Sequence, residues 1–179
     1  MPPTNKRIEP QAPSFPQGSV LAGAVPVTTL REDRVKVCIY GRNRSGKTTL
    51  AAQFAKPMLV ISSEPDANGG ATSISDVEGV LIVRVSAKPL PGDRVHGSAK
   101  VVAIANELAA HNPFKTVVMD TITSLQDVIL VELMGLPKVP EMMSWGMVPD
   151  GVYQSRAEKL RETMRPLIDL TNCNVVILA

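Results

Sequence analysis

The sequence predicts an α/β fold in which a parallel β-sheet carries helices on both faces. Short apolar runs of strand length alternate with longer segments in which apolar residues recur at helical spacing. One strand-to-helix transition also carries a glycine-containing pattern that requires a strand before it and a helix after it. Strands separated by helices cannot pair through tight hairpins, so the sheet is expected to be parallel.

The first part of the expected sheet comes from three apolar runs. Residues 35–40 predict a buried strand, and residues 49–55 predict the helix that follows it. Pro57 introduces a second strand at residues 58–61. Residues 80–85 predict a third strand, and a turn-rich stretch with a Gly–Gly pair lies before it at residues 65–70.

The second part begins after the Pro91–Gly92 turn. Its helices are predicted by apolar stripes at helical spacing and its strands by short, continuous apolar runs. The expected elements are a helix at 98–111, a strand at 116–120, a helix at 122–134, a loop at 135–151, a helix at 156–172 and a strand at 174–179.

Length and composition divide the chain into two parts. The 179 residues suit one α/β domain with a substantial core. Residues 1–30 differ from the rest because six prolines interrupt any helix and apolar residues follow no period. We therefore expect a flexible, Pro-rich N-terminal arm at residues 1–30 and a folded core at residues 31–179.

Charge, cysteines and hydropathy limit the function classes. The formal net charge of +2 is too small to indicate nucleic-acid binding by itself. Cys38 and Cys173 lie in apolar strand-like runs, which favours core positions over a disulfide or a metal pair. The N-terminus does not resemble a signal peptide, and no run approaches the roughly 20 apolar residues of a membrane span. The expected location is the cytoplasm, without membrane contact.

Residues 41–48, GRNRSGKT, match the phosphate-binding pattern G-x-x-x-x-G-K-[ST] between an expected strand and helix. In such a loop, backbone N–H groups and the helix N-terminus surround the phosphates. Lys47 contacts the β- and γ-phosphates, and Thr48 holds Mg²⁺ through its hydroxyl. The chain is therefore predicted to bind a nucleoside triphosphate. The residues expected at the nucleotide are Gly41, Arg42, Asn43, Arg44, Ser45, Gly46, Lys47, Thr48 and Thr49.

Asp120 ends the expected strand at residues 116–120. P-loop NTPases use a carboxylate at such a strand end to orient Mg²⁺ and its waters. Asp120 is therefore predicted to bind Mg²⁺ together with Thr48. An N-cap for the following helix is the alternative interpretation, and the two roles are compatible.

Glu64 follows the expected strand at residues 58–61. The carboxyl ends of parallel strands face one ligand crevice, so Glu64 should lie on the same side as Lys47 and Asp120. There its carboxylate could orient the water that attacks the γ-phosphate, or accept its proton. The alternative is a solvated acid on a loop.

From residue 35 onward, the order of these elements resembles the ATPase core of RecA-like recombinases. It is most similar to the small phage ATP-binding proteins proposed to act in single-strand annealing. The segments that carry the resemblance are the phosphate loop, ISSE at 61–64, SAKVVAIANEL at 98–108, TVVMDTITSL at 116–125 and the Trp-Gly pair at 145–146.

The resemblance implies a Mg²⁺-dependent ATPase of DNA recombination, annealing or repair, with Glu64 and Lys47 as catalytic residues. It also implies a homo-oligomer with ATP held between subunits, and the host cytoplasm as the location of a phage-encoded chain. Residues 135–151 fall where recombinases carry their first DNA-binding loop, which makes single-stranded DNA the expected partner.

The sequence also departs from the recombinase pattern. It ends on the fifth expected strand, before the family's polar sensor and second DNA-binding loop, so the RecA-like fold is expected to be C-terminally incomplete. Residues 135–151 carry Lys138 beside Glu141 and Asp150, which is sparse for a DNA contact. Trp145 either stacks on a base or packs against neighbouring methionines.

Two other functions stay open beside the recombination ATPase. One is a nucleotide-binding assembly protein that hydrolyses little, and the other is a different P-loop enzyme such as a small-molecule kinase. The Asn-Lys-x-Asp motif of GTPases and the Leu-Ser-Gly-Gly-Gln signature of transporters are absent from the sequence, and its short arginine runs do not make a kinase lid.

Overall fold

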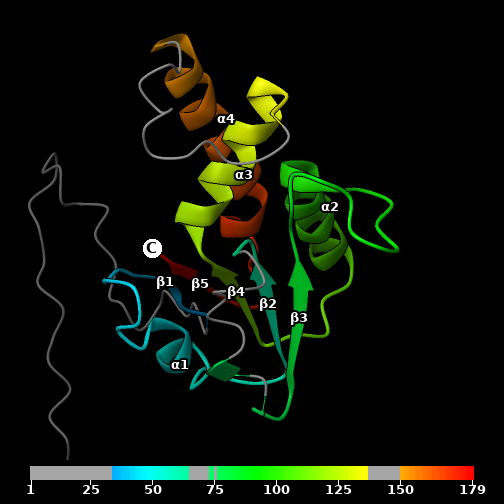
Figure 1. Ribbon diagram of the computed structural model, residues 1–179. Helices are drawn as coiled ribbons and strands as arrows, with labels where there is room; N and C mark the ends of the chain where they lie inside the picture. The colour runs from blue at the N-terminus through cyan, green and yellow to red at the C-terminus, as the bar shows by residue number, and fades with distance from the viewer. Residues whose placement is uncertain (1–33, 65–72, 75, 137–149) are drawn as a thin grey trace, which may run out of the picture. The chain divides into compact units, whose positions relative to one another are not determined.

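The computed structural model describes residues 34–64, 73, 74, 76–136 and 150–179. The strands in this part of the chain form one parallel sheet, in the order β1-β5-β4-β2-β3 (Figure 1). The expected fold class is therefore confirmed, whereas the arm at residues 1–30 and its boundary lie outside the described residues. The strands are β1 (Lys36–Ile39), β2 (Met58–Ser62), β3 (Val80–Arg84), β4 (Thr116–Asp120) and β5 (Asn174–Leu178).

The central strands β2 and β4 are buried at every position. Their side chains alternate between two cores, as the pleat of a strand requires. Leu59 and Ile61 belong to one core, and Met58 and Val60 belong to the other. Continuous apolar runs of this kind are typical of parallel sheets that are covered on both faces.

The edge strand β1 differs from the expectation. Residues 35–40 predict a buried strand, but among the described strands β1 pairs with β5 alone, and Lys36 and Cys38 are exposed. Val37 and Ile39 are partly buried because their side chains point to the other face, where they pack against the core. The expectation that Cys38 is a core residue is therefore wrong, whereas Cys173 is buried as expected.

Three helices cover one face of the sheet, where Figure 1 shows them stacked on the same side. They are α2 (Gly97–Ala110), α3 (Ile122–Met134) and α4 (Asp150–Ile168). α4 begins before and ends before the helix expected at residues 156–172. No helix in the described residues combines the length and the apolar character that a membrane crossing requires. The helices bury Val101, Ala105, Leu125, Ile129, Met164 and Leu167 against the sheet.

The short helix α1 (Lys47–Ala51) packs on the opposite face (Figure 1). Ala51 and Ala52 contribute to a core with Val60, Val118 and Val176. The helix begins two residues earlier than expected because the phosphate-binding pattern runs straight into it. It also ends earlier, because the next two backbone bonds, from residues 53 and 54, have the tighter i→i−3 spacing.

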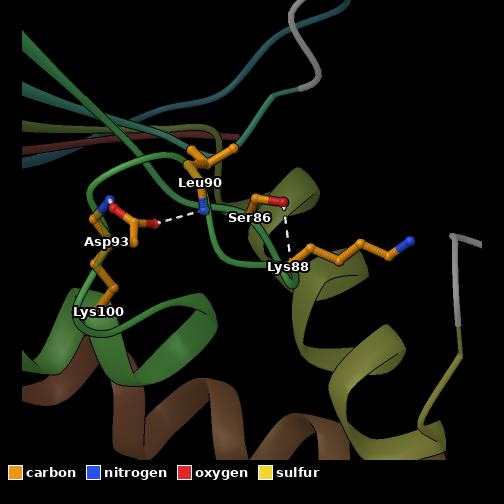
Figure 2. Close-up of polar contacts among 5 residues, drawn as sticks. All are labelled: Ser86, Lys88, Leu90, Asp93 and Lys100. Atoms are coloured by element: carbon orange, nitrogen blue, oxygen red, sulfur yellow. Dashed lines mark hydrogen bonds and ion pairs between the residues drawn. The ribbon is translucent and has the colours of Figure 1, made fainter.

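A closed loop at residues 86–97 joins β3 to α2. The N–H of Gly97 donates to the carbonyl of Ser86 at 2.8 Å, so the two ends of the loop meet. Inside the loop, the carboxylate of Asp93 accepts from the N–H of Leu90 at 3.1 Å and pairs with the ammonium of Lys100 on α2 (Figure 2). These bonds give the loop the character of a compact Ω-loop.

Candidate active site

The phosphate-binding pattern forms a turn between β1 and α1. Two of its residues have left-handed backbone conformations, Arg44 with φ 63° and Gly46 with φ 83°. The N–H of Ser45 donates to the carbonyl of Arg42 at 3.2 Å, which closes the tip of the turn. Gly41 has little room for a side chain, because a Cβ atom there would lie 2.8 Å from Oγ of Ser45.

Lys47 lies at the start of α1 and folds back over this turn. Its Nζ donates to the carbonyl oxygens of Gly41, at 2.7 Å, and Arg42, at 3.1 Å. These two bonds hold the ammonium against the backbone of the turn. Five other residues of the predicted set are exposed: Arg42, Asn43, Arg44, Ser45 and Thr49.

Thr48 and Asp120 are in direct contact. The Thr48 hydroxyl donates to Oδ2 of Asp120 at 3.1 Å. Thr48 is 9% exposed and Asp120 is 1% exposed. β5 lies between β1 and β4, so α1 brings Thr48 across one intervening strand to reach the end of β4. The contact places a hydroxyl and a carboxylate side by side at the carboxyl edge of the sheet.

The environment of Asp120 disfavours its charged form. Burial raises the pKa of the Asp120 carboxyl, and the negative charge of Glu64 raises it further. The Thr48 hydrogen bond and the positive charge of Lys47 act in the opposite direction. The side chains of Lys47, Thr48 and Glu64 therefore all act on the protonation of Asp120.

Glu64 lies two residues beyond the end of β2 and is partly buried. The register of the sheet pairs Ser62 of β2 with Asp120 of β4, which brings the ends of the two strands level. Glu64 therefore stands at the same edge as the phosphate-binding turn, on the side where the sequence predicts it.

The N-cap interpretation of Asp120 is wrong. The N-cap of α3 is Thr121, whose hydroxyl oxygen accepts from the N–H of Ser124 at 3.2 Å. Asp120 instead directs its carboxylate to Thr48. Thr121 caps the helix because it has the extended backbone and the short hydroxyl side chain that N-caps favour.

Sequence reasoning missed Ser63, which lies directly before Glu64. Its backbone and its hydroxyl both bind the turn after Asp120. The only indication in the sequence is the pair of serines that separates an apolar strand from the glutamate. Serine pairs are common in loops, so the pattern alone does not predict these contacts.

Most of the loop expected to contact DNA, including Trp145, lies outside the described residues. The turn-rich stretch at 65–70 also lies outside them. Within the described part of the chain, no three His, Cys, Asp or Glu side chains gather where they could hold a metal ion. Mg²⁺ does not need such a cluster, because one or two carboxylates with water and substrate phosphates suffice.

A family model described as an AAA domain matches residues 33–179, which includes all the described strands and helices. A search of curated proteins finds no match.

Proposed function

Because the chain belongs to the AAA domain family of P-loop ATPases, we propose that it binds ATP with Mg²⁺ and hydrolyses it at the edge formed by Lys47, Thr48, Glu64 and Asp120. The observation that carries the proposal is the 3.1 Å hydrogen bond between Thr48 and Asp120. It joins the phosphate-binding turn to a buried carboxylate from another strand, which a chance glycine-rich turn would not do.

The phosphates are bound by the turn and by Lys47. Backbone N–H groups of the turn and the first residues of α1 donate to phosphate oxygens. Lys47 exchanges the carbonyls of Gly41 and Arg42 for the β- and γ-phosphates, and its charge compensates theirs. The exposed side chains of Arg42 and Arg44 stand beside this position.

The pair formed by Thr48 and Asp120 fits Mg²⁺. A hydroxyl and a carboxylate are both oxygen donors, which is the ligand type that Mg²⁺ selects. Bound there, the ion would neutralise charge that develops on the phosphates during transfer. Burial raises the pKa of Asp120 and so disfavours its carboxylate form, which is the form that an Mg²⁺ ion at this position would favour.

Glu64 acts on the attacking water. Its carboxylate orients that water towards the γ-phosphorus and accepts a proton from it. Its support is its place at the carboxyl edge, near enough for its charge to influence Asp120. Replacement of Glu64 by Gln keeps the shape of the side chain and removes the basic oxygen.

We further propose that the ATPase serves DNA recombination, annealing or repair as a homo-oligomer in the cytoplasm. The support is the similarity of five sequence segments to RecA-like phage proteins. Single-stranded DNA is the proposed partner, with residues 135–151 as the contact.

The test is the rate of ATP hydrolysis with and without single-stranded DNA, with Lys47→Ala as the inactive control. Stimulation by DNA supports the recombination role. Turnover that is independent of DNA but requires a small phosphate acceptor indicates a small-molecule kinase. Nucleotide binding without turnover indicates an assembly protein, and the hydrolytic proposal is then wrong.

A further inference from the structure

The end of β2 is hydrogen-bonded to the chain on both sides, next to β3 and next to β4. On one side, the N–H of Val85 donates to the carbonyl of Ser62 at 2.8 Å. On the other side, the N–H of Ser63 donates to the carbonyl of Asp120 at 2.9 Å. Ser62 and Ser63, the two residues before Glu64, therefore keep backbone hydrogen bonds to the chain on both sides of β2.

The side chain of Ser63 adds a further contact on the β4 side. Its hydroxyl donates to the carbonyl of Thr121 at 2.7 Å, in buried surroundings. The two hydrogen bonds from Ser63 thus reach two successive carbonyls, those of Asp120 and Thr121. Ser63, Asp120 and Thr121 are 6%, 1% and 8% exposed, so solvent does not compete strongly for these groups.

The carbonyl oxygen of Thr121 has a second hydrogen-bond donor besides Ser63. It also accepts from the N–H of Leu125 at 3.1 Å, as the first turn of α3 requires. Loss of the Ser63 hydroxyl therefore leaves no buried carbonyl without a donor. What is lost is the link between the start of α3 and the residue next to Glu64.

On the basis of the proposed function, we propose that Ser63 is a positioning residue that fixes the Glu64 carboxylate relative to the Asp120 carboxylate. One carboxylate acts on water and the other on Mg²⁺, so their separation must be constant during hydrolysis. Ser63 sets this separation because it is covalently next to Glu64 and donates hydrogen bonds to the backbone carbonyls of Asp120 and Thr121.

The test compares Ser63→Ala, Ser63→Thr and a matched control in the full chain. Thr163→Val is the control, because Thr163 is also buried and its hydroxyl also donates a 2.7 Å hydrogen bond to a carbonyl, that of Lys159, but it lies in α4. Ser63→Ala is expected to lower kcat about tenfold, with ATP affinity at saturating Mg²⁺ unchanged. Ser63→Thr restores most of kcat because it keeps the hydroxyl, and Thr163→Val hydrolyses ATP at the wild-type rate.

Two further measurements do not depend on turnover. In the Ser63→Ala protein, the Mg²⁺ concentration for half-maximal Mg²⁺-dependent nucleotide binding rises, because Asp120 is less firmly placed. In the nucleotide-free protein, the amides of residues 63 and 125 exchange hydrogen faster than in wild type or Thr163→Val. A purely structural role would instead lower thermal stability without changing kcat or the Mg²⁺ dependence.

The outcomes separate this inference from the proposed function. If wild type hydrolyses ATP and Ser63→Ala matches it in kcat and in Mg²⁺ dependence, the positioning role is wrong and the ATPase stands. If wild type binds Mg²⁺ and ATP without turnover, the Mg²⁺ titration still decides the role of Ser63. If wild type binds no nucleotide, both proposals fail together.

Discussion

The hydroxyl of Thr48 donates to the carboxylate of Asp120 at 3.1 Å, although 72 residues separate them in the sequence. Thr48 lies in the first turn of α1, directly after the phosphate-binding turn, and Asp120 ends β4, which lies two positions from β1 in the sheet. A contact of this kind forms only when α1, β5 and β4 are all correctly assembled. It therefore reports on both the fold and the proposed Mg²⁺ site.

Replacement of Thr48 tests the two functions of its hydroxyl. Thr48→Val keeps the size of the side chain but removes the donor to Asp120, and with it the proposed Mg²⁺ ligand. We expect Mg²⁺-dependent ATP affinity to fall about tenfold or more, since hydrogen bonds to charged groups contribute about 1.5–3 kcal/mol. Thr48→Ser retains the hydroxyl and should remain within about threefold of wild type. Calorimetric titration measures the ATP affinity of both variants. An affinity of Thr48→Val equal to that of wild type would exclude the Thr48 hydroxyl from the site.

Asp120 should reduce the stability of the nucleotide-free protein at neutral pH. Its folded-state pKa is raised, mainly by burial, above the unfolded value of about 3.9. The stability linked to this shift is fully present below the unfolded pKa and is lost as pH rises through the folded pKa. Asp120→Asn should therefore melt a few degrees above wild type at neutral pH without Mg²⁺, and the difference should disappear in acid. A melting temperature equal to or below that of wild type at neutral pH contradicts the pKa direction.

Asp93 serves as a control because its pKa is shifted in the opposite direction to that of Asp120. Its hydrogen bond from Lys100 lowers the pKa of the Asp93 carboxyl, and the N–H of Leu90 adds to the effect (Figure 2). A lowered pKa gives stability that is present above the unfolded value and is lost as pH falls through the folded value. Asp93→Asn should therefore melt below wild type at neutral pH, while Asp120→Asn melts above it.

The junction between the loop at 86–97 and α2 requires glycine at its last position. Gly97 has φ 61°, and a Cβ atom there would overlap the carboxylate of Glu132 on α3. That carboxylate accepts from the N–H of Ser98 at 2.9 Å and so caps α2 from a neighbouring helix. Gly97→Ala should destabilise the protein by the strain of a left-handed alanine, about 1–2 kcal/mol, and by about 1 kcal/mol more for the lost cap.

Gly92→Ala is the matched control for that substitution. Gly92 also has a positive φ, 85°, but no atom lies within 4 Å of a Cβ built on it. Gly92→Ala should show only the strain of a left-handed alanine, so its melting temperature should fall less than that of Gly97→Ala. Each kcal/mol of difference in stability between the two variants corresponds to about 2–4 °C in melting temperature. Equal melting temperatures for the two variants would show that Glu132 does not cap α2 in solution.

The two cysteines should differ in reactivity. Cys38 is exposed on the edge strand β1, whereas Cys173 is buried and burial raises the pKa of its thiol. The reactive species is the thiolate, so Cys173 is protected by both access and pKa. The native protein should take up one equivalent of a thiol reagent rapidly, and the second only after unfolding. Cys38→Ser should abolish the rapid phase, and rapid labelling of that variant would contradict the burial of Cys173.

The sequence predicts local structure here better than it predicts assembly. The helix expected at residues 122–134 has the same bounds as α3, and the strand at 116–120 has those of β4. These segments have strong apolar patterns with clear ends: Thr121 caps α3, and Gly135 ends it with φ 61°. The phosphate-binding turn was equally predictable, because its glycine and lysine spacing is dictated by local backbone geometry.

The order of the strands was not predictable in the same way. Apolar residues at 35–40 have the composition of a buried strand, yet β1 lies at the sheet edge and exposes Cys38. Edge position depends on which strand inserts next to β1, and that strand is β5, the last in the chain. The contacts of Ser63 with the Asp120 turn likewise follow from the register of β2 and β4, which a single sequence does not encode in a recognisable pattern.

The most direct test of the proposed hydrolytic site measures ATP binding and ATP hydrolysis in the same preparations of wild type, Lys47→Ala and Glu64→Gln. Lys47→Ala should lose nucleotide binding, because the phosphates lose the cation that meets them. Glu64→Gln should bind ATP within about threefold of wild type and lose about 100-fold or more of kcat, the usual contribution of a general base. Wild-type turnover in Glu64→Gln, or wild-type ATP affinity in Lys47→Ala, would contradict the site proposed for this chain.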